Sequence, residues 1–105
     1  MEESTTGFKL LLSYEINTNE LQEYYQFVME RYVPTMQEIG WQMSEAWHTA
    51  YGDSPNRLIG FVCENRQIVD ELLENKNWSD LNQQLKQYVT DFKYKVIPYR
   101  GGFQI

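Results

Sequence analysis

The order of strand-like and helix-like segments is the feature that most constrains the fold of this chain. Four segments alternate between apolar and polar residues or form short apolar runs, as β-strands do, and they span residues 8–16, 41–51, 57–64 and 91–99. Two longer segments carry apolar residues at helical spacing, and they span residues 17–40 and 66–89. The predicted order is therefore β-α-β-β-α-β, one of the recurring split βαβ units.

This order predicts a ferredoxin-like α+β fold. Right-handed crossovers give one four-stranded antiparallel sheet with both helices on one face. The opposite face is too apolar for water, because it receives Leu11, Lys95, Ile97 and one side of the hairpin formed by residues 41–64. We therefore expect a second copy of the sheet to cover this face about a two-fold axis, which makes the protein a homodimer.

The first helical segment carries start, stop and break signals. Asn17 and Glu20 resemble a capping box, and Gly40 suits a helix C-terminus. Pro34 should kink or break the helix, because it removes a hydrogen bond and clashes with the preceding turn. The expected apolar stripe consists of Leu21, Tyr25, Val28, Tyr32, Met36 and Ile39.

The second helical segment is predicted as two pieces. Asn65 can cap the first piece, and the polar residues 75–77 interrupt it. The second piece begins near Trp78, with Asn77 or Ser79 as its cap. We expect the Trp78 ring to fill the corner between the two pieces rather than to cover a ligand cavity.

Length and charge limit the number of domains and the classes of partner. With 105 residues, 42% of them hydrophobic, the chain can bury one modest core. We expect one domain over residues 8–100, with a flexible N-terminus at 1–7 and a C-terminal tail at 101–105. The formal charge is −6 and the nine basic residues are scattered, so nucleic acids and anionic membranes are poor partners.

The N-terminal residues and the cysteine content predict a cytoplasmic location. Residues 1–16 carry acidic side chains where a signal peptide needs basic ones, and no apolar run approaches the roughly 18 residues of a membrane span. Cys63 is the only cysteine, which excludes an intrachain disulfide and a cysteine-based zinc site and fits a reducing compartment. Its apolar strand predicts an inert core thiol.

Four stretches of the sequence together resemble a known superfamily. They are the "YEI" strand, the long helix broken as "RYVPTMQEIGW", the "AYGDSPNRLIGF" hairpin and the second helix split before "NWSDL". In this layout the chain resembles the dimeric α/β-barrel superfamily of ferredoxin-like domains, most closely its NIPSNAP and antibiotic-biosynthesis-monooxygenase branches. The resemblance covers roughly residues 8–100 and implies a dimer with back-to-back sheets, but no catalytic signature accompanies it.

The resemblance also implies where a ligand would bind. Known members include cofactor-independent monooxygenases acting on aromatic polyketides, muconolactone-isomerase-like enzymes, haem-degrading or haem-binding proteins and stress-response proteins. Their ligands commonly lie between the sheet and its helices. Mapped onto this chain, the implied lining residues are Tyr14, Tyr25, Tyr32, Trp47 or His48, Phe61 and Tyr94. The haem-degrading members carry a histidine on the second helical region, which here contains none, so haem binding is poorly supported and would need a tyrosine as the iron ligand. We expect no cofactor.

His48 is the only histidine and the only candidate for a catalytic residue. Its unperturbed pKa suits a general base, but no Ser or Cys nucleophile with a partnering acid is recognisable beside it. Strand alternation places Trp47 on one face of the sheet and Ala46, His48 and Ala50 on the other, and the sequence leaves open which face is which. Because the carboxylates show no paired spacing, we predict no metal site.

Two function hypotheses remain. One is a small dimeric ligand-binding or regulatory protein with an aromatic-lined pocket between sheet and helices. The other is an enzyme, a cofactor-independent monooxygenase or isomerase acting on a small aromatic or polyketide-like substrate. The absence of a catalytic constellation in the sequence favours the first hypothesis.

Overall fold

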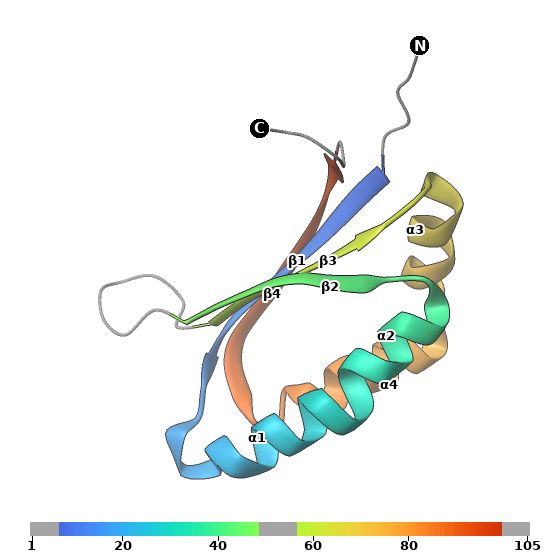
Figure 1. The fold of residues 1–105 in the computed structure, drawn as a ribbon. Helices are drawn as coiled ribbons and strands as arrows, with labels where there is room; N and C mark the ends of the chain where they lie inside the picture. Colours follow the sequence, from blue (N-terminus) through green and yellow to red (C-terminus); the bar gives the residue numbers. More distant parts are fainter. Residues whose placement is uncertain (1–6, 49–56, 100–105) are drawn as a thin grey trace.

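A layer of helices packs against one face of a four-stranded sheet (Figure 1). The structure is a computed structural model and describes residues 7–48 and 57–99. The strands are β1 (Gly7–Ile16), β2 (Gln42–His48), β3 (Arg57–Cys63) and β4 (Val89–Tyr99). The helical segments are η1 (Thr18–Glu20), α1 (Leu21–Phe27), η2 (Val28–Tyr32), α2 (Val33–Ile39), α3 (Arg66–Leu73) and α4 (Lys76–Leu85).

The topology confirms the predicted ferredoxin-like fold. The strand order is β2-β3-β1-β4, with every neighbouring pair antiparallel. All the α-helices lie on the same side of the sheet (Figure 1). The predicted turn at residues 52–56, residues 1–6 and the tail at 101–105 lie outside the described residues.

Strand alternation gives the sheet two chemically different faces. On β1, Leu10, Leu12 and Tyr14 point toward the helices and are buried, while Lys9 and Leu11 between them point the other way. We call these the helix-side face and the outer face. By strand register the outer face also carries Ser13 from β1, Glu45 and Trp47 from β2, Leu58, Gly60 and Val62 from β3, and Lys93, Lys95 and Ile97 from β4.

A glycine in the middle of β3 shapes the outer face. Gly60 lies between Leu11 on β1 and Glu45 on β2, and a Cβ atom there would lie 3.0 Å from Cγ of Glu45. Because this position has no side chain, the Lys9 ammonium reaches across β3 and donates to Oε1 of Glu45 at 2.8 Å. The hydrogen bond from Lys9 lowers the pKa of the Glu45 carboxyl, against a smaller effect of its burial.

The first helix changes its hydrogen-bonding pattern instead of breaking at the proline. The turn before Pro34 is π-helical, and the Val33 N–H donates to the Val28 carbonyl five residues earlier. A π turn widens the helix and relieves the clash between the proline ring and the preceding carbonyls. The helix ends, as predicted, at Gly40, which adopts a left-handed conformation with φ of 112°.

The π turn also changes which residues face the core. The expected stripe is wrong at its start, because Leu21 and Tyr25 are exposed while Tyr24 and Phe27 are buried. A stripe drawn at the α-helical period runs out of phase where one turn contains an extra residue. The capping box is absent as well: Asn17 caps η1 by accepting from the Asn19 N–H, and Glu20 makes no side-chain cap bond.

The second helical segment is split as predicted, but it ends at Leu85, and Val89, predicted as its last apolar residue, is the first residue of β4. The Asn65 side chain accepts from the Ile68 N–H and caps α3. The cap of α4 is Asn75, whose side chain accepts from the Trp78 N–H, rather than Asn77 or Ser79. Each asparagine stands immediately before its helix, where a short polar side chain can reach the free backbone donors.

A buried chain of hydrogen bonds joins the two helical segments. The Trp78 indole N–H donates to the Tyr32 hydroxyl at 2.9 Å, and that hydroxyl donates to Oδ1 of Asn82 at 2.7 Å. All three side chains are buried, so Trp78 fills the corner as predicted. The Tyr32 hydroxyl is thereby used as both donor and acceptor, which holds α4 against the π turn.

We expect Tyr32→Phe to lower the free energy of unfolding by about 1–3 kcal/mol, because it leaves the Trp78 donor and the Asn82 acceptor buried without a partner. Tyr25→Phe removes the same atom from an exposed residue and should change stability by less than about 0.5 kcal/mol. Urea unfolding followed by tryptophan fluorescence measures both. Equal losses in the two variants would contradict the role assigned to the buried hydroxyl.

Candidate functional site

The space between sheet and helices is filled by large side chains. Of the residues that the sequence places around a ligand, Tyr14, Tyr32 and Phe61 lie in this core with at most 2% of their surface exposed. Trp41 and Tyr24, which are fully buried, pack into the same layer. The three predicted lining residues therefore belong to one cluster of buried core side chains.

The buried tyrosine hydroxyls are bonded to protein groups. The Tyr14 and Tyr24 hydroxyl oxygens lie 2.6 Å apart, and their rings meet edge to face with centroids 5.8 Å apart. Burial raises the pKa of Tyr14, and the neighbouring Tyr24 raises it further. Burial also raises the pKa of Tyr24 and of Tyr32, although hydrogen bonds from Tyr14 and Trp78 respectively oppose it. These hydroxyls hold their protons and cannot act as bases near neutral pH.

The other predicted site residues lie at the surface. Tyr25 on α1 is 38% exposed, and Tyr94 on β4 is 47% exposed with its ring edge-on to Trp78. Trp47 lies on the outer face and is 61% exposed, so the sheet separates it from Tyr14. His48 stands opposite Arg57 on the helix-side face, the orientation that the sequence leaves open, and its side chain is exposed.

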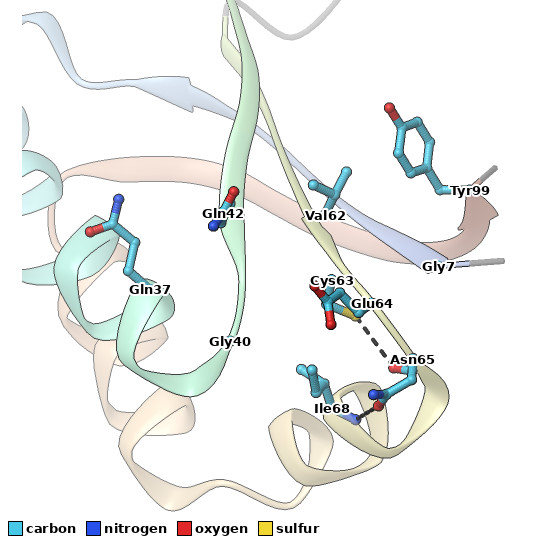
Figure 2. A pocket seen from close by; sticks show the side chains of 10 residues that line it. All are labelled: Gly7, Gln37, Gly40, Gln42, Val62, Cys63, Glu64, Asn65, Ile68 and Tyr99. Atoms are coloured by element: carbon cyan, nitrogen blue, oxygen red, sulfur yellow. Dashed lines mark hydrogen bonds between the residues drawn. The ribbon is translucent and has the colours of Figure 1, made fainter. Parts of the chain in front are cut away.

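A cleft lies at the end of the sheet where β2 and β3 separate (Figure 2). It has a volume of about 810 Å³, within the usual range for a small-molecule site. Its lining residues come from six elements and the short connections between them: Gly7, Gln37, Gly40, Gln42, Val62, Cys63, Glu64, Asn65, Ile68 and Tyr99. None of the residues that the sequence singled out for ligand binding is among them.

Two close backbone approaches form the cleft. The backbone of Gly7 lies so close to the carbonyl of Cys63 that no Cβ atom would fit between them. Gly40 approaches Ile68 on α3, and a Cβ atom at Gly40 would lie 3.2 Å from Cδ1 of Ile68. Gly40 therefore brings the end of α2 close to α3, and Gly7 brings the start of β1 close to the end of β3.

The chemistry of the cleft suits hydrogen bonding to an uncharged molecule. Side-chain amides of Gln37, Gln42 and Asn65 supply donors and acceptors, while Val62 and Ile68 supply apolar surface. The Glu64 carboxylate disfavours an anion there. The Cys63 thiol donates to the Asn65 carbonyl at 3.5 Å, and burial raises its pKa, as expected for an unreactive core thiol (Figure 2).

Arg57 is a polar residue whose surroundings could not be recognised in the sequence. It is the first residue of β3, and its strand neighbours in register are Tyr14 on β1 and His48 on β2. The guanidinium lies over the Tyr25 ring, 5.5 Å from its centroid. A lone arginine at the start of a strand has no spacing signature, so only the register reveals that it stands among tyrosines.

Residues 7–48 and 57–99 contain neither a cluster of metal ligands nor a membrane span. In these ranges, no three His, Cys, Asp or Glu side chains come together as a metal site would require. No helix within them combines the length and the apolar character needed to cross a bilayer.

The raised pKa values of the buried tyrosines predict loss of stability in alkali. Below pH 10, near the ordinary pKa of a tyrosine side chain, folded and unfolded chains both keep these protons; above it only the unfolded chain releases them. Each such group should then lower the free energy of unfolding by about 1.4 kcal/mol per pH unit. In a titration at 295 nm, we expect Tyr14, Tyr24 and Tyr32 to ionise only on unfolding. Ionisation of every tyrosine without loss of structure would contradict this.

Solved structures with the same fold identify the layout. A NIPSNAP family protein from Agrobacterium tumefaciens is similar with a TM-score of 0.65 and 14% identity, over 99% of this chain and 93% of that one. A putative antibiotic biosynthesis monooxygenase from Nitrosomonas europaea gives a TM-score of 0.64 and 12% identity, over 98% and 96% of the two chains. A NIPSNAP domain protein from Burkholderia xenovorans gives 0.63 and 9%, over 93% and 99%. No protein-family model matches the chain, and no curated protein matches its sequence. The chain therefore has the ferredoxin-like fold shared by NIPSNAP and antibiotic-biosynthesis-monooxygenase-like proteins.

Proposed function

We propose that this chain is a homodimeric protein that binds a small, uncharged aromatic molecule without transforming it. The observation that carries the proposal is the contrast between a core filled by bonded side chains and an open, amide-lined cleft of about 810 Å³. A reducing cytoplasm is part of the proposal, because Cys63 is a free buried thiol.

The outer face supports the dimer. By register, an apolar stripe runs diagonally across all four strands, through Trp47, Leu58, Leu11 and Ile97. The Lys9–Glu45 ion pair beside the stripe is already satisfied within the chain. None of the four stripe residues is buried in the monomer. Packing a second sheet on the stripe would remove this apolar surface from water.

The cleft supports the choice of ligand. Val62 and Ile68 offer apolar contacts to a ring, the Tyr99 ring lies at the same opening, and the amides can bond phenol, amide or quinone oxygens (Figure 2). Val62 and Gln42 belong to the outer side of the sheet, so the opening lies beside the surface proposed for dimerisation.

The enzyme hypothesis, a monooxygenase or isomerase, has less support. The buried hydroxyls between sheet and helices are paired with protein groups, and their raised pKa values keep them protonated. The residues that line the cleft include no histidine and only one tyrosine, Tyr99. They therefore offer no histidine and no pair of tyrosines that could move a proton between substrate and protein. We therefore keep catalysis as an outcome of the ligand experiment below.

The dimer is tested by placing a charge on the apolar stripe. In light scattering at micromolar concentration, we expect wild type at twice the 12.6 kDa of the chain and Leu11→Glu at the monomer mass, because taking an ionised carboxylate out of water between the two sheets costs free energy. Met29→Glu is the matched control, since Met29 is 59% exposed on a helix and should stay dimeric. A monomeric wild type, or a dimeric Leu11→Glu, would contradict the proposal.

The ligand site is tested by titrating 4-hydroxybenzamide and a naphthoquinone while recording side-chain amide signals by NMR. We expect saturable shifts of the Gln37 and Asn65 amides in wild type. Gln42→Trp should abolish them by filling the opening, and Gln26→Trp, which changes another exposed glutamine outside the cleft, should keep them. Shifts confined to the core around Tyr14 and Phe61, or turnover of the probe, would favour the enzyme hypothesis instead.

A further inference from the structure

We propose a second site, at the opposite end of the sheet, where Arg57 binds a small-molecule oxyanion, a carboxylate or a phosphate, beside His48 and Tyr25. This site shares no residue with the cleft and does not depend on the ligand proposed for it.

The geometry holds the guanidinium in one place. Arg57 points from β3 to the helix side, where α1 packs with Tyr24 buried and Tyr25 half exposed. The Tyr25 ring lies 5.5 Å from the guanidinium carbon, a cation–π contact, and meets the Tyr24 ring edge to face at 5.1 Å. This contact restricts where the planar fork of guanidinium donors can lie.

The guanidinium of Arg57 keeps a buried donor that the described part of the chain does not use. Its Nε is shielded from solvent, and among residues 7–48 and 57–99 it has no hydrogen-bond partner. A buried charged donor without an acceptor costs free energy, which an oxyanion accepting from the fork would recover. Burial raises the pKa of Tyr24, and both the charge of Arg57 and a hydrogen bond from its side chain oppose that rise, so the guanidinium already uses another of its donors on the Tyr24 hydroxyl while its Nε stays without a partner.

The other described cations are satisfied or solvated. Lys9 bonds Glu45, and Arg66 bonds Asp70 one helical turn away at 3.2 Å. Arg31 and the remaining lysines are exposed, so water can solvate their charges. Within these residues Arg57 alone combines a positive charge, a shielded nitrogen and no carboxylate within ion-pair distance.

His48 and Ala46 leave the site open to a ligand. In the β2–β3 register His48 lies directly opposite Arg57, and Ala46 precedes it on the same face opposite Ile59. Both β2 residues are exposed, so no helix covers this part of the strand. The imidazole can donate to an oxyanion held by the guanidinium, and the exposed face of Tyr25 can contact an attached ring.

The test uses the imidazole signals of His48, which are unique because the chain has one histidine. At fixed pH, benzoate and inorganic phosphate are titrated into the full-length protein, with benzyl alcohol as the uncharged control. We expect saturable shifts of the His48 signals with one or both anions and none with benzyl alcohol. The Gln37 and Asn65 amides should not respond to the anions, which separates this site from the cleft.

Three variants decide whether Arg57 is responsible. Arg57→Gln should weaken anion binding at least tenfold, and Arg57→Lys severalfold, because lysine keeps the charge but loses the fork. Arg66→Gln should bind as wild type does, since that arginine is exposed and paired with Asp70. Unshifted His48 signals in wild type, equal shifts with benzyl alcohol, or undiminished binding by Arg57→Lys would overturn the proposal even if Arg57→Gln fails to fold.

Discussion

The helix layer of this fold depends on the single π turn at Val28–Tyr32. Tyr24 and Tyr32 lie eight residues apart, and at about 100° per residue in an α-helix they would end about 80° out of phase. A wider turn between them lets both rings point at the sheet, where both are buried. The two hydroxyl pairings follow, one to Tyr14 on β1 and one to Asn82 on α4.

The fold could be predicted because its signals are local. The apolar run of β1, the alternation along β4, the asparagine before α3 and the glycine after α2 each specify structure within a few residues. The order of these elements then leaves few topologies. Which residues of α1 face the core could not be predicted, because the α-helical spacing of apolar residues does not indicate that a later turn contains an extra residue. The choice between Tyr24 and Tyr25 depended on that turn.

The candidate sites could not be predicted in the same way. The cleft assembles from the ends of several elements, and its amides have no characteristic spacing in the sequence. The aromatic content does not locate a ligand site, because tyrosines can pack in a core as well as line a pocket when each hydroxyl has a hydrogen-bond partner. His48 is a candidate from the sequence because it is the only histidine, whereas the position of Arg57 beside it follows only from the strand register. Both the cleft and Arg57 lie near the ends of the strands, at opposite ends of the sheet.

Gly60 has a consequence for evolution as well as for packing. The ion pair between Lys9 and Glu45 crosses a strand that lies between them, and it does so through the space of one missing side chain. Any substitution of this glycine would place a Cβ atom against the Glu45 side chain, which would have to give way by a few tenths of an ångström. A larger side chain would extend further along the path by which the Lys9 ammonium reaches Oε1 of Glu45. The absence of one side chain at the centre of the sheet thus lets two opposite charges neutralise each other within the chain, beside the apolar stripe.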